Sequence, residues 1–591
     1  MARVVCICRR APGAPPETRG ETAAVIERLN RRLTPDNITP NPALVFDEHG
    51  VVTAVLNPTD AHTRKGASVA LGFLVHAGED WWRPRAGVPD GCFALFRADD
   101  TAIELVNDVV ASRTIWYAHT NDLFIASTSQ RAIVALLGSF EPNPGVAAWM
   151  LSAGQLGPDN SYDRRIRVLR PNSRVVLDRA AWRVTVTETP NDIVPVERSR
   201  TEHADGLVRA IERVFAGLDL DPGRWVLPLS GGVDSRAILS WLKSRDGLRA
   251  VTWGVRAALD DKGTDAYVAA QVARHFHLDH RFFETDVSNE PAEKIFTRFL
   301  AVGEGRTDAV AGYTDGFKIW KSLFDEKAAG VIRGDECFGL RGGVHTPFDA
   351  RRYVSCLLLS DYGNLPPSLA SELPQTLPDH LARRSGEPIL RWRDRLYYNY
   401  RMPFAMAALT DLKVPYVEVV NPFLARSIVD YMRTVPDALR LKKNLFVEIA
   451  EGIGPDIPYA ERAAIDTSLN VFRTKTVVDM IQDELGSKRA SLIFPENVIQ
   501  FVRANARSQA APAAAKPETH AKYAVPKTIR KPLGELTAKP RAMLRERLKR
   551  PALDPNIMAF RAFLAVRMHE IFEEDAGVFS AARGERGTHD L

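Results

Sequence analysis

Cysteine and long hydrophobic runs are both scarce in this sequence. The 591 residues include five cysteines and no CxxC pair, which indicates neither a disulfide framework nor a zinc knuckle. No apolar segment approaches the roughly 20 residues that cross a bilayer, and the first residues lack the apolar core of a signal peptide. We therefore expect a cytoplasmic protein with reduced thiols and no membrane partner.

An excess of one charge is also missing. The chain has 78 Lys and Arg against 73 Asp and Glu, for a net charge of +5, whereas nucleic-acid-binding domains are strongly basic. We expect no nucleic-acid partner. Apolar residues make up 45% and charged residues 26%, which is typical of globular proteins. Because one hydrophobic core rarely supports a chain of this length, two or more domains are expected.

Two secondary-structure patterns divide the chain. Short strand patterns separated by turns dominate the first third, at residues 68–75, 92–96, 102–106 and 123–127. After a charged stretch at 195–200, strand patterns alternate with longer helical patterns, which is typical of a parallel sheet covered by helices. The sequence predicts a β-rich domain at residues 1–195 and an α/β domain at residues 196–503.

The composition changes toward the end of the chain. Residues 504–540 are rich in Ala, Pro and Lys, and we interpret them as a linker or flexible loop without a packed core. Residues 541–591 are predicted to form a C-terminal helical extension. Within it, apolar residues at helical spacing predict an amphipathic helix over about 556–573 that docks on another part of the protein.

A glycine loop is the strongest motif. The sequence Ser-Gly-Gly-Val-Asp-Ser at residues 230–235 follows a buried strand pattern and precedes a helical one. Glycine lets backbone N–H groups approach phosphate oxygens, and a helix N-terminus favours an anion. Asp234 suits a Mg²⁺ ion that bridges phosphates, and the loop lacks the Gly-Lys-Ser/Thr of a Walker A motif. We assign ATP binding to its six residues, Ser230, Gly231, Gly232, Val233, Asp234 and Ser235.

With the following arginine, the loop at residues 230–236 resembles the pyrophosphate loop of the asparagine synthetase family, whose members cleave ATP between the α and β phosphates. Other motifs of that family are similar to this sequence in the same order, at residues 250–254, 263–273 with His280, 334–339 and 421–446. The resemblance covers about 205–465. It implies an adenine-nucleotide α-hydrolase-like synthetase domain that uses ATP and Mg²⁺.

The resemblance also implies roles for single residues. Further nucleotide-binding residues would be Thr252, Trp253, Gly254 and Gly334. Asp335 would join Asp234 as a second Mg²⁺ ligand. The catalytic residues map onto Asp335, Glu336 and Lys443, the last neutralising charge on the phosphate and the tetrahedral carbon. Lys442 competes for that role, and since adjacent helical residues point about 100° apart, only one of the two can face the site.

The general base stays open. Glutamine-dependent members carry a glutamate shortly before the Asp-Glu pair, where this sequence has Ile332 beside Arg333. The candidates are Glu336, Glu304, Asp308, Tyr397 and Tyr398. The spacing of His277 and His280 predicts that both lie on one helical face, but the family carries a structural histidine there, so we expect no metal at this point.

The first 195 residues resemble the glutaminase domain of the same family, at residues 90–95, 105–108, 116–117, 124–127 and 167–171. The resemblance implies an Ntn-hydrolase-like sandwich. The family's glutaminase nucleophile is a cysteine exposed by removal of Met1, and its α-amino group is the base; here residue 2 is Ala2. Cys6 and Cys8 lack the free amine, and we interpret them as strand residues. We therefore predict that the glutaminase-like domain is inactive.

An inactive glutaminase leaves the substrate to supply the amine. The resemblance then points to members without glutaminase activity, which include β-lactam and carbapenam synthetases and lasso-peptide macrolactam cyclases. The length and tail of this chain are more similar to the cyclases. This resemblance implies an AMP-forming carbon–nitrogen ligase that activates a carboxylate as an acyl-adenylate, with intramolecular macrolactam formation on a peptide. A leader-peptide-binding protein and a protease would be its partners.

Three alternatives remain. An amidating enzyme of the same family would act on a small molecule or a polysaccharide precursor. A nucleotide-binding pseudoenzyme would have lost Asp234, Asp335 or Lys443, and all three are present. A tRNA-modifying ATP pyrophosphatase shares the loop but would need a thiol pair or a strongly basic surface.

Overall fold

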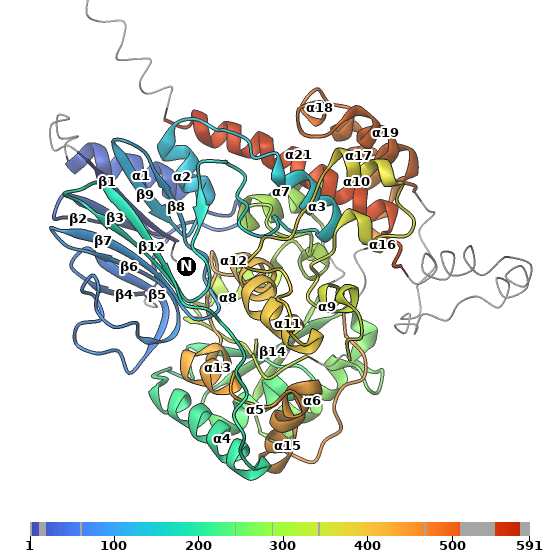
Figure 1. Ribbon diagram of the computed structural model, residues 1–591. Helices are drawn as coiled ribbons and strands as arrows, with labels where there is room; N and C mark the ends of the chain where they lie inside the picture. The colour runs from blue at the N-terminus through green and yellow to red at the C-terminus, as the bar shows by residue number, and fades with distance from the viewer. Residues whose placement is uncertain are drawn as a thin grey trace, which may run out of the picture.

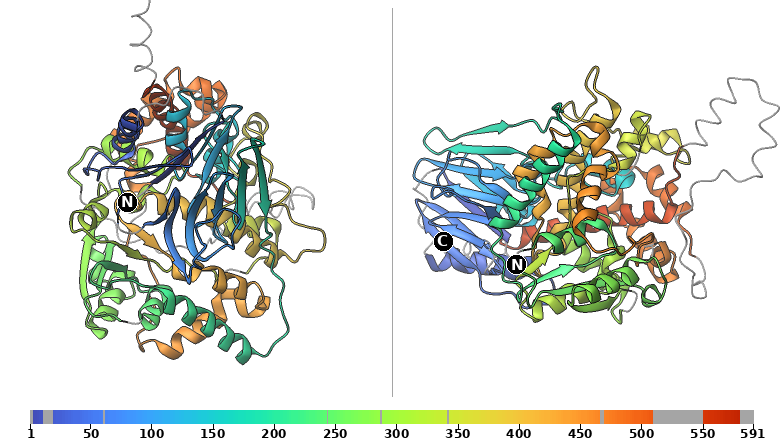
Figure 2. Two further views of the ribbon diagram at one scale, coloured as in Figure 1. Left: turned by 90° about the vertical axis from the view of Figure 1, so that its left-hand side faces the viewer. Right: turned by 90° about the horizontal axis from the view of Figure 1, so that it is seen from below.

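The computed structural model describes residues 3–10, 19–59, 62–242, 244–285, 288–340, 343–465, 469–508 and 550–579. Ala2 and most of the linker predicted at 504–540 lie outside the described residues. Figures 1 and 2 show antiparallel sheets on one side of the molecule and a parallel sheet with its helices on the other. The predicted fold class, α/β with a β-rich N-terminal sandwich and a C-terminal parallel sheet, is confirmed.

Two six-stranded antiparallel sheets form the sandwich. The first sheet, in the order β10-β8-β9-β1-β3-β2, contains β1 (Arg3–Arg9), β2 (Leu44–Glu48), β3 (Val51–Leu56), β8 (Trp116–His119), β9 (Leu123–Ser127) and β10 (Arg167–Val168). The second, in the order β12-β11-β7-β6-β5-β4, contains β4 (His62–Lys65), β5 (Ser68–Val75), β6 (Asp90–Ala98), β7 (Ala102–Asn107), β11 (Ser173–Asp178) and β12 (Arg183–Glu188). Apolar side chains from both sheets share one core. The other face of the first sheet is covered by α1 (Arg19–Leu33) and α2 (Gln130–Leu137).

Cys6 and Cys8 lie on β1 with their side chains in the core between the sheets, as strand residues. Burial raises the pKa of the Cys6 thiol to about 12 and raises that of Cys8 as well. Because the thiolate is the reactive form of cysteine, neither side chain is suited to replace the missing glutaminase nucleophile.

A five-stranded parallel sheet forms the centre of the second part of the chain. In the order β15-β14-β13-β16-β17, its strands are β13 (Trp225–Pro228), β14 (Arg249–Gly254), β15 (Asp279–Glu284), β16 (Gly330–Ile332) and β17 (Glu418–Val420). The helix that precedes it, α4 (Arg200–Gly217), begins with a capping box in which Ser199 and Glu202 satisfy each other's backbone N–H groups. Carboxyl ends of parallel strands meet at one edge of a sheet, which is where ligands bind in open α/β sheets.

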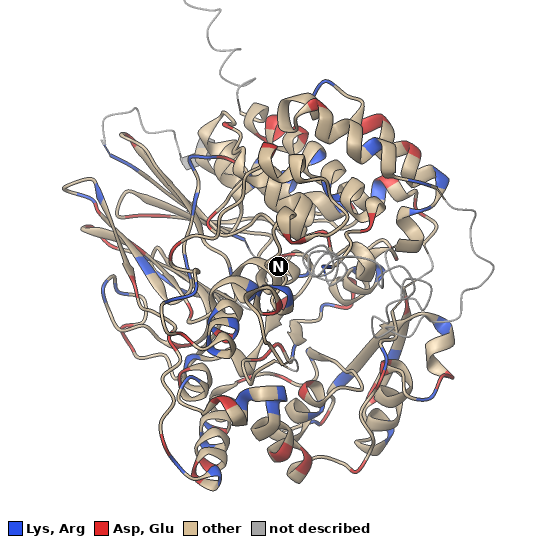
Figure 3. Ribbon diagram, turned by 45° about the vertical axis from the view of Figure 1, so that its right-hand side comes forward, with Lys and Arg blue, Asp and Glu red and all other residues tan. Residues whose placement is uncertain are grey.

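Many helices separate or follow the strands of the parallel sheet along the chain. They include α5 (Val233–Trp241), α6 (Asp265–His275), α7 (Ala292–Gly303), α8 (Lys318–Asp325), α9 (Pro347–Tyr353), α10 (Pro367–Glu372), α11 (Ile389–Leu396), α12 (Ala407–Asp411), α13 (Arg426–Met432), α14 (Asp437–Arg440), α15 (Asn444–Ile453), α16 (Leu469–Phe472), α17 (Lys475–Leu485), α18 (Ala490–Ile493) and α19 (Glu496–Asn505). Lys and Arg are interspersed with Asp and Glu along these elements in Figure 3. In the described part of the chain, no helix is long and apolar enough to cross a membrane.

The C-terminal helix α21 (Pro555–Gly577) covers the segment where the sequence predicts an amphipathic helix. That interpretation is wrong in one respect, because buried residues occur all around the helix rather than along one face. The reason is its position: α21 contacts α2 and α3 (Gly145–Ala153) of the N-terminal part as well as α7, α17 and α19. Figure 1 shows it running across the top of the molecule between these elements.

Candidate functional site

The glycine loop joins β13 to α5, as the sequence predicts. Gly232 is the N-cap residue of α5 with extended backbone angles, and no side chain caps the helix. The Ser230 and Ser235 hydroxyl oxygens lie 3.1 Å apart, and the Ser230 N–H donates to the Ser235 hydroxyl. The loop therefore presents two hydroxyls beside an uncapped helix N-terminus, which is an arrangement that binds phosphate.

Gly231 allows another segment to approach the loop. A Cβ added to Gly231 would lie 2.4 Å from the Cβ of Ala460 and 2.9 Å from that of Val268. The Gly231 N–H donates to Asp265 at the start of α6 over 3.2 Å. The absence of a side chain at this position is thus required by packing, and the backbone of the loop is fixed by its neighbours.

Lys443 forms ion pairs with two carboxylates from different segments of the chain. Its Nζ donates to the two carboxylate oxygens of Asp234 over 3.0 and 2.9 Å and lies 2.8 Å from Glu336 Oε1. Lys443 is 8% exposed and Glu336 is 7% exposed. The structure therefore brings together three of the residues that the sequence analysis selected.

The pKa values of this cluster reflect burial and mutual charge. Burial raises the pKa of Glu336 to about 7, with Asp234 adding to the rise and Lys443 opposing it. Burial acts to lower the pKa of Lys443, but the carboxylates of Glu336 and Asp234 outweigh it and raise that pKa above its usual value. Lys443 is consequently a fixed cation at the end of the phosphate loop.

The expected helical register of Lys442 and Lys443 is wrong. Both residues have left-handed backbone angles, with φ of 60° and 59°, and α15 begins only at Asn444. The Lys442 N–H donates to the carbonyl of Leu340 over 3.0 Å, which ties this turn to the segment that contains Glu336. Lys442 is exposed while Lys443 is buried. The side chains of Lys442 and Lys443 therefore point in different directions because they lie in a tight turn, and not because of helical spacing.

The predicted Mg²⁺ ligands Asp234 and Asp335 lie on neighbouring loops, since a Cβ on Gly334 would be only 3.0 Å from the Cβ of Asp234. Asp335 lies 3.3 Å from Arg333, whereas Asp234 faces Lys443. Among the described residues, no group of three or more His, Cys, Asp or Glu side chains is arranged to hold a metal ion. Because Mg²⁺ usually binds through one or two carboxylates plus phosphates and water, these residues fit an ion that arrives with a nucleotide.

Three of the further residues predicted to bind the nucleotide, Thr252, Trp253 and Gly254, lie at the carboxyl end of β14. Thr252 donates to the carbonyl of Leu229 over 2.7 Å, and its hydroxyl lies 2.8 Å from His280 Nε2. Trp253 packs edge-on against Trp320. A Cβ on Gly254 would be 2.4 Å from the carbonyl oxygen of Ala464. These contacts place the end of β14 beside the phosphate loop.

The helical interpretation of His277 and His280 is also wrong. The helix α6 ends at His275, and His277 has a φ of 53°. His280 lies on β15, where burial lowers its pKa. Its bond to Thr252 gives it a structural role between two strands.

The other base candidates divide into two groups. Tyr397 and Tyr398 donate to the carbonyls of Glu336 and Cys337 over 2.9 and 3.0 Å. Glu304 pairs with Arg3 and accepts from the N–H of Gln130, so it joins the two parts of the chain. Asp308 pairs with Arg561 of α21 at 2.6 Å. Glu336 is the candidate that contacts Lys443, and the two tyrosines support its backbone.

Two features of this region were not found from the sequence. Lys413 is 4% exposed, its amine donates to the carbonyl of Leu409, and burial lowers its pKa well below the usual value. Residues 457–464 lie across the phosphate loop and the end of β14. Neither carries a periodic or motif signal, because both depend on contacts with distant parts of the chain.

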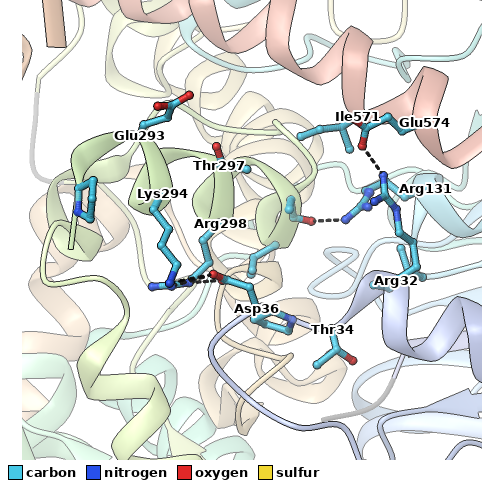
Figure 4. Close-up of a pocket in the computed structure, with 15 residues that line it drawn as sticks. Arg32, Thr34, Asp36, Arg131, Glu293, Lys294, Thr297, Arg298, Ile571 and Glu574 are labelled. Carbon is cyan, nitrogen blue, oxygen red and sulfur yellow. Dashed lines mark hydrogen bonds and ion pairs between the residues drawn. The ribbon is translucent and has the colours of Figure 1, made fainter. Parts of the chain in front are cut away.

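A cavity lies outside this region. It measures about 530 Å³ and lies between α1, α7 and α21 (Figure 4). Its charged side chains are in ion pairs with one another or with nearby residues, as between Arg32 and Glu574 or between Arg298 and Asp36. None of the residues predicted for the site lines it. We therefore locate the candidate site by the cluster around Lys443 and not by cavity size.

The similarity of this chain to known solved structures is weak. No curated protein sequence matches the chain. One similar solved structure, the allosteric regulatory enzyme of purine biosynthesis, is 9% identical with a TM-score of 0.21 over 49% of this chain and 82% of that chain. Another, glutamine phosphoribosylpyrophosphate amidotransferase from B. subtilis complexed with ADP and GMP, is 8% identical with a TM-score of 0.20 over 47% of this chain and 65% of that chain. Neither similarity bears on the function of this chain.

Residues 226–314 match the family model of asparagine synthase. The matched segment begins in β13 and contains the whole phosphate loop and the end of β14, while Glu336 and Lys443 lie beyond it. The match therefore supports ATP-dependent amide-bond-forming chemistry in general for this chain, by similarity to asparagine synthase.

Proposed function

We propose that the protein is an AMP-forming carbon–nitrogen ligase that activates a carboxylate with ATP and joins it to an amine. The observation that carries this proposal is the contact of Lys443 with both Asp234 of the phosphate loop and Glu336 beyond β16. One buried cation thus contacts both the loop that suits pyrophosphate, after the central strand β13, and the segment that follows its neighbour β16. Both steps of such a reaction develop negative charge that a fixed cation stabilises.

In the first step, an oxygen of the substrate carboxylate attacks the α-phosphorus and the bond to the β-phosphate oxygen breaks, releasing pyrophosphate. The uncapped start of α5 and the hydroxyls of Ser230 and Ser235 hold the departing phosphates. In the second step, the amine nitrogen attacks the acyl carbon, AMP leaves, and the amine proton passes to a base. Lys443 would neutralise charge in both steps, and its contacts with Asp234 and Glu336 support this role. A Mg²⁺ ion held by Asp234 and Asp335 would supply charge neutralisation for the triphosphate.

The proposed acyl donor and amine belong to one peptide, which makes the product a macrolactam. Two features of the sequence support this part: the resemblance to macrolactam cyclases, and Ala2 in place of the nucleophile that would generate ammonia. A leader-peptide-binding protein and a protease are the proposed partners, in the cytoplasm. The alternative is amidation of a small molecule or polysaccharide precursor. A pseudoenzyme is disfavoured, because Asp234, Glu336 and Lys443 are all present and Lys443 forms ion pairs with both acids.

The test is ATP–pyrophosphate exchange with purified protein and candidate carboxylates, including the precursor peptide if a short one is encoded nearby. We expect exchange that depends on the carboxylate, AMP as the nucleotide product, and a peptide product that has lost one water. The variant Lys443→Met should lose exchange, whereas Lys442→Met should retain it. Release of ADP and phosphate would contradict the cleavage position, and a linear amidated peptide would contradict ring formation.

A further inference from the structure

A segment far along the chain lies against the phosphate loop. Residues 457–464, which we term the crossing segment, follow α15 and the turn after it. The Ala460 N–H donates to the Gly231 carbonyl over 2.9 Å. The Cβ of Ala460 would be 2.4 Å from a Cβ on Gly231. The crossing segment thus touches the loop at the residue that most needs to be glycine.

Arg236 stabilises the contact between the crossing segment and the phosphate loop by hydrogen bonds to both. It lies in the first turns of α5, is 4% exposed, and donates to the carbonyls of Gly231 over 3.2 Å and of Pro458 over 2.7 Å. It also donates to the carbonyl of Ile457. Its guanidinium lies 4.6 Å from the ring centre of Tyr459. One planar cation therefore binds the loop and three consecutive residues of the crossing segment.

These contacts fix the orientation of a peptide group in the loop. The Gly231 carbonyl accepts from both Arg236 and Ala460. In a trans peptide the C=O and the following N–H point in opposite directions. The Gly232 N–H consequently points away from the crossing segment, and it lies 3.2 Å from the Ser230 hydroxyl oxygen. The N–H donor of the loop is thus turned toward the serine hydroxyls.

The same segment reaches the end of β14. The carbonyl of Ala464 accepts from the N–H of Val255 over 2.8 Å and would be 2.4 Å from a Cβ on Gly254. Between its two ends, the carbonyl of Arg462 accepts from the N–H of Asp265, whose carboxylate accepts from the Gly231 N–H. The phosphate loop, α6 and the end of β14 are therefore linked through one short segment.

We propose that Arg236 and the crossing segment are positioning elements for the triphosphate, which set the phosphate loop in its anion-binding conformation before the nucleotide arrives. The inference rests on the proposed function, since it assumes that the loop binds ATP. Arg236 acts through the Gly231 peptide and touches no phosphate. Its loss should therefore weaken the binding of phosphates while leaving the binding of the nucleoside nearly unchanged.

Calorimetric titration of the full chain with MgATP, magnesium pyrophosphate and adenosine tests this. Arg236→Gln should weaken MgATP and pyrophosphate binding roughly 10- to 100-fold, the scale of a lost charge-assisted hydrogen bond, with adenosine affinity changed less than about twofold. Arg236→Lys should recover part of the loss, because lysine keeps the charge but not the planar fork. Tyr459→Leu leaves the arginine in place and should show the same pattern with a smaller loss.

The matched control is Arg245→Gln. Arg245 also donates to a backbone carbonyl, that of Leu239, and lies over the ring of Phe276 at 5.2 Å, but it contacts neither the loop nor the crossing segment. It should leave all three affinities unchanged. If adenosine binding falls as much as pyrophosphate binding in the Arg236 and Tyr459 variants, or if all variants bind as wild type, the positioning role is wrong. If wild-type protein binds neither MgATP nor pyrophosphate, the proposed function itself fails.

Discussion

The Nζ of Lys443 lies 2.8 Å from a carboxylate oxygen of Glu336, at the point where a left-handed turn precedes α15. Because the turn is tied by its backbone to Leu340, a main-chain hydrogen bond and the ion pair both join the segments that carry the cation and the carboxylate. Lysine usually loses much side-chain freedom when it is fixed. Here that loss is incurred on folding, so the charge is already in place when substrate binds, which is the condition for effective electrostatic catalysis.

Replacing Lys443 with methionine should lower the rate of pyrophosphate release roughly 10²–10³-fold, the scale for one preorganised donor. Nucleotide affinity should change little if the lysine acts on charge that appears in the transition state. The measurement is single-turnover release together with nucleotide titration. Lys442→Met is the control, since Lys442 is exposed beside it. Equal losses in the two variants would indicate a diffuse electrostatic role.

The proposed role of Asp234 and Asp335 as Mg²⁺ ligands can be tested by substituting each in turn. Asp234→Ala and Asp335→Ala should each abolish substrate-dependent pyrophosphate release with the fold retained, because each removes one of two proposed ligands. Thermal unfolding with and without MgATP reports the ion separately from activity. We expect MgATP to raise the unfolding temperature of wild type and to do so much less for either variant. Full stabilisation of a variant by MgATP would exclude that residue as a ligand.

Glutamine should not be a source of ammonia for this protein. The resemblance to glutaminase domains implies a nucleophilic cysteine at position 2, where this sequence has Ala2, and burial raises the pKa values of the Cys6 and Cys8 thiols. Glutamate release from glutamine should equal that of heat-inactivated protein. Measurable glutamine hydrolysis that is lost on purification to homogeneity would come from a contaminant, whereas activity that persists would refute the prediction.

The sequence predicted those elements of the fold whose secondary structure is determined by the local pattern of residues. The strand at residues 68–75 is β5 with the same bounds, since a short, mostly apolar run between turns leaves few other choices. The loop at residues 230–235 lies between a strand and a helix for the same reason. Local patterns alone do not predict the cluster of Asp234, Glu336 and Lys443, because its members come from three distant segments. The family resemblance was needed to select them together.

The incorrect and missing predictions also share a physical cause. His277 and His280 both lie beyond the end of α6 at His275, a helix end that hydropathy spacing does not mark. The two left-handed residues before α15 are lysines, although glycine is the residue that usually indicates such a turn. The crossing segment contacts the loop and β14 mainly through alanine and backbone groups, which leave no pattern in the sequence. In each of these places, tertiary contacts override local preference.

The last prediction concerns how α21 is held. Asp575 is fully buried on this helix, and its carboxylate accepts from Arg131 over 2.6 and 2.9 Å and from Arg32 over 2.8 Å. Removing one partner of a buried ion pair leaves an uncompensated charge, which typically costs about 3–5 kcal/mol. Asp575→Ala should therefore lower the free energy of unfolding by that order in denaturant titration.

The neighbouring Glu574 provides the matched control for this prediction. It pairs with the same Arg32 at 2.7 Å, but its side chain is 56% exposed, and exposed pairs contribute about 0–1 kcal/mol. Glu574→Ala should thus have little effect on unfolding. Because α21 contacts both parts of the chain, Asp575→Ala should also increase protease cleavage near the C-terminus under native conditions. Equal effects of the two variants would mean that burial of the Asp575 pair does not hold the helix, and that its apolar contacts with α2, α3 and α17 suffice.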